Sequence, residues 1–98
     1  MLEKAYEEDD LVIVTFSLSE EIWADHIALV GDFNDWDAQA HLLQQTREDG
    51  SWHISLELPA GRTYRFRYLI DDQEWMDDNH ADGYLPNAFG EFDSVVQT

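Results

Sequence analysis

The sequence has no cysteine and very few cations. Without cysteine, the chain can form neither a disulfide framework nor a thiolate metal site. Its 5 lysine and arginine residues stand against 22 aspartate and glutamate residues, which gives a formal net charge of −17. This charge repels nucleic-acid backbones and anionic membrane surfaces, so we expect neither as a partner. An uncharged ligand meets no such penalty.

Long apolar runs are also absent. No stretch approaches the roughly 18 apolar residues of a membrane-spanning helix, and the N-terminal residues lack the apolar run of a signal peptide. We therefore expect a cytoplasmic protein. The 98 residues fit one domain over residues 1–98. Within it, residues 1–10 are an acidic N-terminal segment, which is a candidate for a flexible one.

Apolar residues recur mostly with period two, which predicts β-strands. Residues 19–25 are the only candidate for a helical turn, and an irregular run is expected from the polar turn at residues 71–74 to about residue 90. Six to eight short strands without alternating helices predict an all-β sandwich. The predicted strands cover residues 12–18, 27–33, 42–46, 51–58, 63–70 and 92–97.

Glycine marks two of the predicted turns. Asp49-Gly50 is a strong hairpin signal because glycine accepts a positive φ without strain, so the strands on either side of it should pair. Residues 59–61, with the sequence Pro-Ala-Gly, should end the next strand before residues 63–70 begin the most regular one.

Position separates the four tryptophans. Trp52 shares its strand parity with apolar residues and should point inward, and Trp23 should cover an edge of the core. Trp36 and Trp75 each follow a polar turn, where strand parity does not bury them, so both are expected to be exposed. An exposed indole is costly unless it binds something, and its flat face suits the C–H face of a sugar ring.

Three of the five cations, Arg62, Arg65 and Arg67, fall within six positions. Arg65 and Arg67 must share one face of their strand. They either neutralise the acidic surface through exposed ion pairs or donate hydrogen bonds to sugar hydroxyls beside Trp75.

The sequence resembles the family 48 carbohydrate-binding modules, also called isoamylase N-terminal-like or early-set domains, and especially their small stand-alone bacterial members. The resemblance implies an immunoglobulin-like antiparallel β-sandwich that binds α-1,4-linked glucan such as glycogen, starch or maltooligosaccharides without catalysis. No cofactor is implied. The blocks that carry the resemblance are residues 29–36, 58–61, 64–71, Trp75, and residues 86–90 followed by 94–96.

The resemblance also suggests the binding residues. In the glycogen-binding domain of AMP-activated protein kinase, the two exposed tryptophans and a basic residue match Trp36, Trp75 and Arg67. Two positions depart from the family: Asp93 replaces a common asparagine, and Glu91 replaces the kinase domain's threonine. An ionised carboxylate only accepts hydrogen bonds, which puts donation from these positions in doubt. The expected carbohydrate-binding residues are Trp36, Trp75, Arg67, Arg65, Asn34, Asn87, Phe89 and Gly90.

Three other functions compete with glucan binding. Glycoside hydrolysis needs two carboxylates at a set separation in an enclosed site, for which 98 residues leave little room. A calcium loop over residues 77–83 is disfavoured because His80 and Phe89 stand where an EF-hand needs ligands. The strongest rival is a protein-interaction module that docks on a glycogen-metabolising enzyme or another partner and uses the same exposed aromatic residues.

Overall fold

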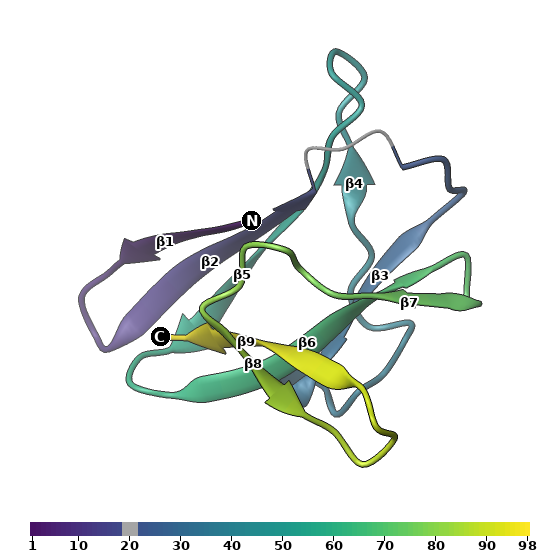
Figure 1. Cartoon of the computed structure of the whole chain (residues 1–98). Helices are drawn as coiled ribbons and strands as arrows, with labels where there is room; N and C mark the ends of the chain where they lie inside the picture. The colour runs from purple at the N-terminus through teal and green to yellow at the C-terminus, as the bar shows by residue number, and fades with distance from the viewer. Residues whose placement is uncertain (19–21) are drawn as a thin grey trace.

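The chain folds into two antiparallel β-sheets (Figure 1). The structure, a computed structural model, describes residues 1–18 and 22–98. One sheet has the order β1-β2-β5-β4. Its strands are β1 (Leu2–Tyr6), β2 (Leu11–Leu18), β5 (Trp52–Pro59) and β4 (Gln44–Gln45).

The second sheet has the order β3-β6-β9-β8, and β7 pairs with β6 outside that path. Together the two sheets confirm the predicted all-β sandwich. The strands of the second sheet are β3 (Ile27–Gly31), β6 (Thr63–Ile70), β9 (Phe92–Gln97), β8 (Gly83–Pro86) and β7 (Glu74–Met76).

The core lies between the inner faces of the two sheets. Along β2, every second residue is buried, as period-two alternation requires. The ring of Phe16 meets that of Phe66 on β6 edge-on, with centroids 5.1 Å apart, and Phe66 meets Tyr68 in the same way at 5.7 Å. Trp52 is 4% exposed and joins this core, as its parity predicts.

The turns fall where the sequence predicts them. Gly50 has a φ of +75° in the β4–β5 hairpin, and Gly61 has a φ of +74° between β5 and β6. Asp71 and Asp72 also take positive φ values and form the tight turn from β6 to β7. Aspartate tolerates this left-handed conformation better than most residues, which explains its presence in such a turn.

Three strands lie in two segments where the sequence predicted none. Within the acidic N-terminal segment, Leu2–Tyr6 pair with β2 through a turn at Asp9 and Asp10, both with positive φ. Such a turn suits the twist of a hairpin. The run after residue 71 contains β7 and β8. These strands lie at sheet edges and are short or half-polar, so their alternation is weak.

The prediction for residues 19–25 was wrong where it can be checked. Residues 19–21 lie outside the described residues, and residues 22–25 are not helical. Ile22 and Ala24 pack on the core, while Trp23 between them is 92% exposed rather than covering a core edge. A 3₁₀ turn instead follows β3 at Asp32–Asn34. Within the described residues, no helix is long and apolar enough to cross a membrane.

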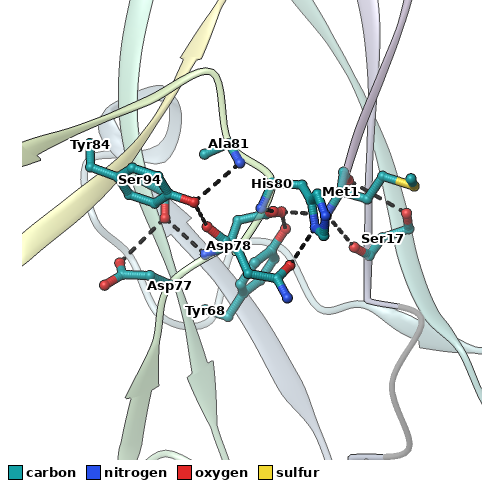
Figure 2. A network of polar contacts seen from close by, with 10 residues as sticks. Met1, Ser17, Tyr68, Asp77, Asp78, His80, Ala81, Tyr84 and Ser94 are labelled. Carbon is teal, nitrogen blue, oxygen red and sulfur yellow. Dashed lines mark hydrogen bonds and ion pairs between the residues drawn. The ribbon is translucent and has the colours of Figure 1, made fainter.

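A buried carboxylate links the two sheets (Figure 2). Asp78 is fully buried, and its carboxylate accepts a hydrogen bond from the Tyr68 hydroxyl at 2.8 Å and pairs with the Met1 amino group at 2.7 Å. The Asp78 backbone amide donates to the Ser94 hydroxyl at 2.9 Å, and its carbonyl accepts from Tyr84. Burial raises the pKa of Tyr68 well above its ordinary value, and the nearby Asp78 charge raises it further, so the hydroxyl stays a donor.

Replacing Asp78 with alanine should destabilise the fold. The substitution leaves the buried Tyr68 hydroxyl without its acceptor, which costs about 1–3 kcal/mol. Urea unfolding followed by circular dichroism would measure the loss, with Glu57→Ala, an exposed carboxylate on β5, as the control. Equal unfolding midpoints for the two variants would contradict this role for Asp78.

Candidate functional site

A groove of about 770 Å³ lies on the outer face of the second sheet. β6 forms its floor, and the turn after β3, strand β7 and the β8–β9 loop form its sides. The residues that line it are Asp32, Trp36, Arg65, Arg67, Trp75, Pro86, Asn87, Ala88, Phe89, Glu91 and Asp93.

The alternation of β6 places both arginines in this groove. Phe66 and Tyr68 face the core, so Arg65 and Arg67 face outward together, as their spacing predicts. Trp75 on β7 is paired in register with Leu69, which puts its ring diagonally opposite Arg67 on the same face. The Arg67 guanidinium carbon lies 5.7 Å from the centroid of the Trp75 ring, within the range of a cation–π contact.

A strained turn holds Trp36 on the opposite side of the groove. Asp35 and Trp36 have φ values of +55° and +58°, and each non-glycine residue in such a conformation costs roughly 1–3 kcal/mol. Two contacts offset this cost. The Trp36 amide donates to the Gly31 carbonyl at 2.9 Å, and its indole Nε1 donates to Asp32 Oδ1 at 2.9 Å.

The same turn is fastened to the floor of the groove. The second carboxylate oxygen of Asp32 accepts a hydrogen bond from the Arg65 amide at 2.8 Å. Gly31 allows this approach because a Cβ there would lie 2.4 Å from the Arg65 carbonyl oxygen and 2.9 Å from the Phe66 Cβ. The glycine of the Gly-Asp-Phe-Asn block is therefore required for space, since its φ of −172° is ordinary extended backbone.

Both indole rings remain partly open to solvent. Trp36 is 37% exposed and Trp75 is 44% exposed, which agrees with the exposure predicted for both. The two rings and the two guanidinium groups line one groove.

The β8–β9 loop closes one side of the groove. The Asn87 side-chain oxygen accepts hydrogen bonds from the amides of Phe89 and Glu91, at 2.9 and 3.1 Å. Phe89 is 87% exposed at the tip of this loop. Gly90 has a φ of +80°, a conformation that glycine adopts without a steric penalty.

Three carboxylates engage the two arginines. Asp77 Oδ1 accepts from Arg67 Nε at 3.1 Å, and Glu91 Oε2 lies 3.6 Å from Arg67 Nη2. The Asp93 carboxylate, in a residue only 6% exposed, lies 3.3 Å from Arg65 Nη1. It also accepts a hydrogen bond from the Asn87 side-chain nitrogen at 3.1 Å. A guanidinium has five N–H donors, more than these carboxylate contacts use. Ion pairing and ligand binding are therefore compatible roles for both arginines.

Two of the residues expected to bind carbohydrate do not line the groove. The Asn34 side-chain oxygen accepts from the Gly31 amide at 3.0 Å, and its nitrogen donates to the Leu29 carbonyl at 2.8 Å, so it holds the turn in shape. Gly90 shapes the β8–β9 loop through its backbone. The other six expected residues line the groove. Sequence reasoning missed Asp32, although it adjoins Gly31 in the same block.

The acidic segment at residues 77–83 does not gather its carboxylates around one point. Asp77 faces Arg67, and Asp78 is buried, while Asp82 accepts from Lys4 Nζ at 2.6 Å and from the Gln97 amide at 2.8 Å. Across residues 1–18 and 22–98, no three histidine or acidic side chains are grouped so as to hold a metal ion.

Comparison with known families gives this groove a context. The family model described as carbohydrate-binding module 48 (isoamylase N-terminal domain) matches residues 4–84. The chain belongs to this family. Its fold is accordingly the immunoglobulin-like early-set sandwich that the sequence predicts, and the family is one of non-catalytic carbohydrate-binding modules.

This family 48 module is also similar to part of several enzymes. It is 34% identical over 55 residues to the 1,4-alpha-glucan branching enzyme GlgB of Mesorhizobium japonicum. This match covers 52% of the module and 8% of the enzyme. The Rhodopirellula baltica enzyme of the same name is 35% identical to the module over 60 residues, a match that covers 57% of the module and 8% of the enzyme. The Bacillus cereus (strain B4264) enzyme is 33% identical over 63 residues, a match that covers 60% of the module and 9% of the enzyme. The matched part of the module thus covers less than a tenth of each relative's length.

The contacts of Asp32 predict how the Trp36 ring responds to mutation. Asp32→Ala removes the acceptor of both the indole and the Arg65 amide, and should lower the unfolding free energy by about 1–3 kcal/mol. Acrylamide quenching of Trp36 should also increase, measured in a Trp23→Phe, Trp75→Phe background so that buried Trp52 is the other emitter. Asp32→Asn, which keeps one acceptor oxygen, should give an intermediate result. Unchanged quenching in Asp32→Ala would contradict the anchoring of Trp36.

Proposed function

We propose that residues 1–98 act as one non-catalytic unit that binds α-1,4-linked glucan, such as glycogen, starch or maltooligosaccharides. One observation carries the proposal: two partly exposed indole rings and two guanidinium groups line a single groove. Membership of family 48 supports it, and so do relatives whose names specify 1,4-alpha-glucan as their substrate.

The groove offers the two kinds of contact that a glucose unit needs. The C–H face of a sugar ring packs on an aromatic face, and we assign this role to Trp36 and Trp75. Sugar hydroxyls accept from guanidinium N–H groups and donate to carboxylates, and we assign the donors to Arg65 and Arg67. Asn87, Phe89 and Gly90 contribute by shaping the β8–β9 loop, with the exposed Phe89 ring available to a bound chain.

The affinity for short oligosaccharides should be modest. The groove lies on the outer surface of a sheet, so a bound glucan keeps much of its own solvent contact. We expect dissociation constants for maltooligosaccharides in the micromolar to millimolar range, or about −8 to −4 kcal/mol.

Removing either platform ring should weaken glucan binding. Trp36→Ala and Trp75→Ala should each reduce affinity for maltoheptaose at least about tenfold, equivalent to 1.4 kcal/mol. Titration calorimetry with maltoheptaose and gel retardation by glycogen would measure this.

Trp23→Ala is the matched control because Trp23 is 92% exposed but does not line the groove. It should bind like the unmodified protein. If glycogen fails to retard the unmodified protein, or if Trp23→Ala alone abolishes retardation, the groove is not the glucan site.

A second candidate function is docking on a partner protein, such as a glycogen-metabolising enzyme. The specific observation in its favour is the exposure of Trp23, which lies with Ile22 beside Gln45, Glu48 and Asp49 of the β4–β5 hairpin. A docking module would keep its partner when Trp36 and Trp75 are replaced and lose it when Trp23 is replaced.

A further inference from the structure

The groove that we propose as the glucan site carries more negative than positive charge. Its lining holds the guanidinium groups of Arg65 and Arg67 and the carboxylates of Asp32, Glu91 and Asp93. Asp77 adds a further carboxylate at the edge, 3.1 Å from Arg67 Nε. Both cations are thus already matched by carboxylates before any ligand arrives.

The fold positions Glu91 and Asp93 beside the two arginines. Asp93 is 6% exposed, and both Arg65 and the Asn87 side-chain nitrogen contact its carboxylate. The Glu91 backbone amide donates to Asn87 Oδ1 at 3.1 Å, and the Glu91 carboxylate lies 3.6 Å from Arg67 Nη2. An anionic group that accepts from a free guanidinium N–H group also comes close to the carboxylates already paired with that arginine, and their repulsion opposes the attraction.

We propose that the groove selects uncharged α-glucan and discriminates against glucan that carries phosphate monoester groups, and that Glu91 and Asp93 set this selectivity. The inference rests on the glucan-binding function proposed above. A neutral hydroxyl shares a guanidinium with a carboxylate at no electrostatic cost, because it accepts from a free N–H group. A phosphate carries about −1.5 to −2 charges at pH 7, and beside either arginine it is repelled by carboxylates closer than the Debye length of about 8 Å.

Competing affinities test this proposal directly. We would measure dissociation constants for maltoheptaose and for maltoheptaose bearing one phosphate monoester, by calorimetry at about 0.15 M salt. The unmodified protein should bind the neutral chain at least about tenfold more tightly. Glu91→Gln removes one groove charge with little change of shape at a residue whose side chain is 61% exposed, and should reduce that preference to about threefold or less.

A matched control separates the local charge of the groove from the charge of the whole chain. Glu57→Gln changes the net charge by the same amount, at an exposed position in the other sheet, and should leave the preference unchanged. Asp93→Asn keeps an acceptor for Asn87 but removes the ion pair with Arg65, and should also reduce the preference.

The outcomes separate this inference from the proposed function. Equal affinity of the unmodified protein for both ligands would overturn the selectivity while leaving glucan binding intact. The same conclusion follows if Glu57→Gln shifts the preference as much as Glu91→Gln does, because long-range repulsion would then be the cause. No binding of maltoheptaose at all would refute the glucan-binding function itself.

Discussion

Strand β6 is the element on which both the core and the groove depend, because antiparallel pairing occupies both of its edges. One edge pairs with β3, while the other is shared by β9 over residues 63–66 and by β7 over residues 68–70. Arg67 lies at the point where β9 leaves this edge and β7 joins it. Side chains from both neighbours reach it there: Asp77 from the segment after β7, and Glu91 from the loop before β9. Strand pairing, rather than any single contact, therefore gathers the charged groups of the site.

Much of the fold could be predicted because its central strands bury one face and leave the other polar. Alternation along residues 63–70 identified which residues face the core and which two arginines face outward, and Asp49-Gly50 identified a hairpin. The edge strands β1, β7 and β8 were missed for the opposite reason. They bury little, so nothing in their sequences demands a regular apolar pattern. Trp23 was misplaced because a helical turn was assumed where residues 22–25 are not helical.

The site was only partly predictable for a related reason. Six expected residues line the groove because strand parity and turn positions determine where they point. Asn34 was expected to bind ligand, but side-chain amides also hydrogen-bond nearby backbone, and its local partners at Gly31 and Leu29 prevail. The burial of Asp78 could not be read from the sequence either. Its partners, Tyr68 and Ser94, come from distant strands, and an acidic segment of the chain usually predicts a solvated loop.

The groove and the buried carboxylate belong to one continuous set of hydrogen bonds. Asp78 donates through its backbone amide to Ser94 Oγ, Ser94 donates to Asp77 Oδ1 at 3.3 Å, and Asp77 accepts from Arg67, whose guanidinium lies over the Trp75 ring (Figure 2 shows the inner part of this chain). An arginine side chain free in solution loses much rotamer freedom when it binds a ligand, and that loss opposes affinity. Folding has already imposed most of this loss of rotamer freedom on Arg67, since its side chain is only 10% exposed and is paired with Asp77. The energy that stabilises the sandwich thus also orders Arg67 in the groove that we propose as the binding surface, so a small domain with an open groove can hold this side chain in place before a ligand arrives.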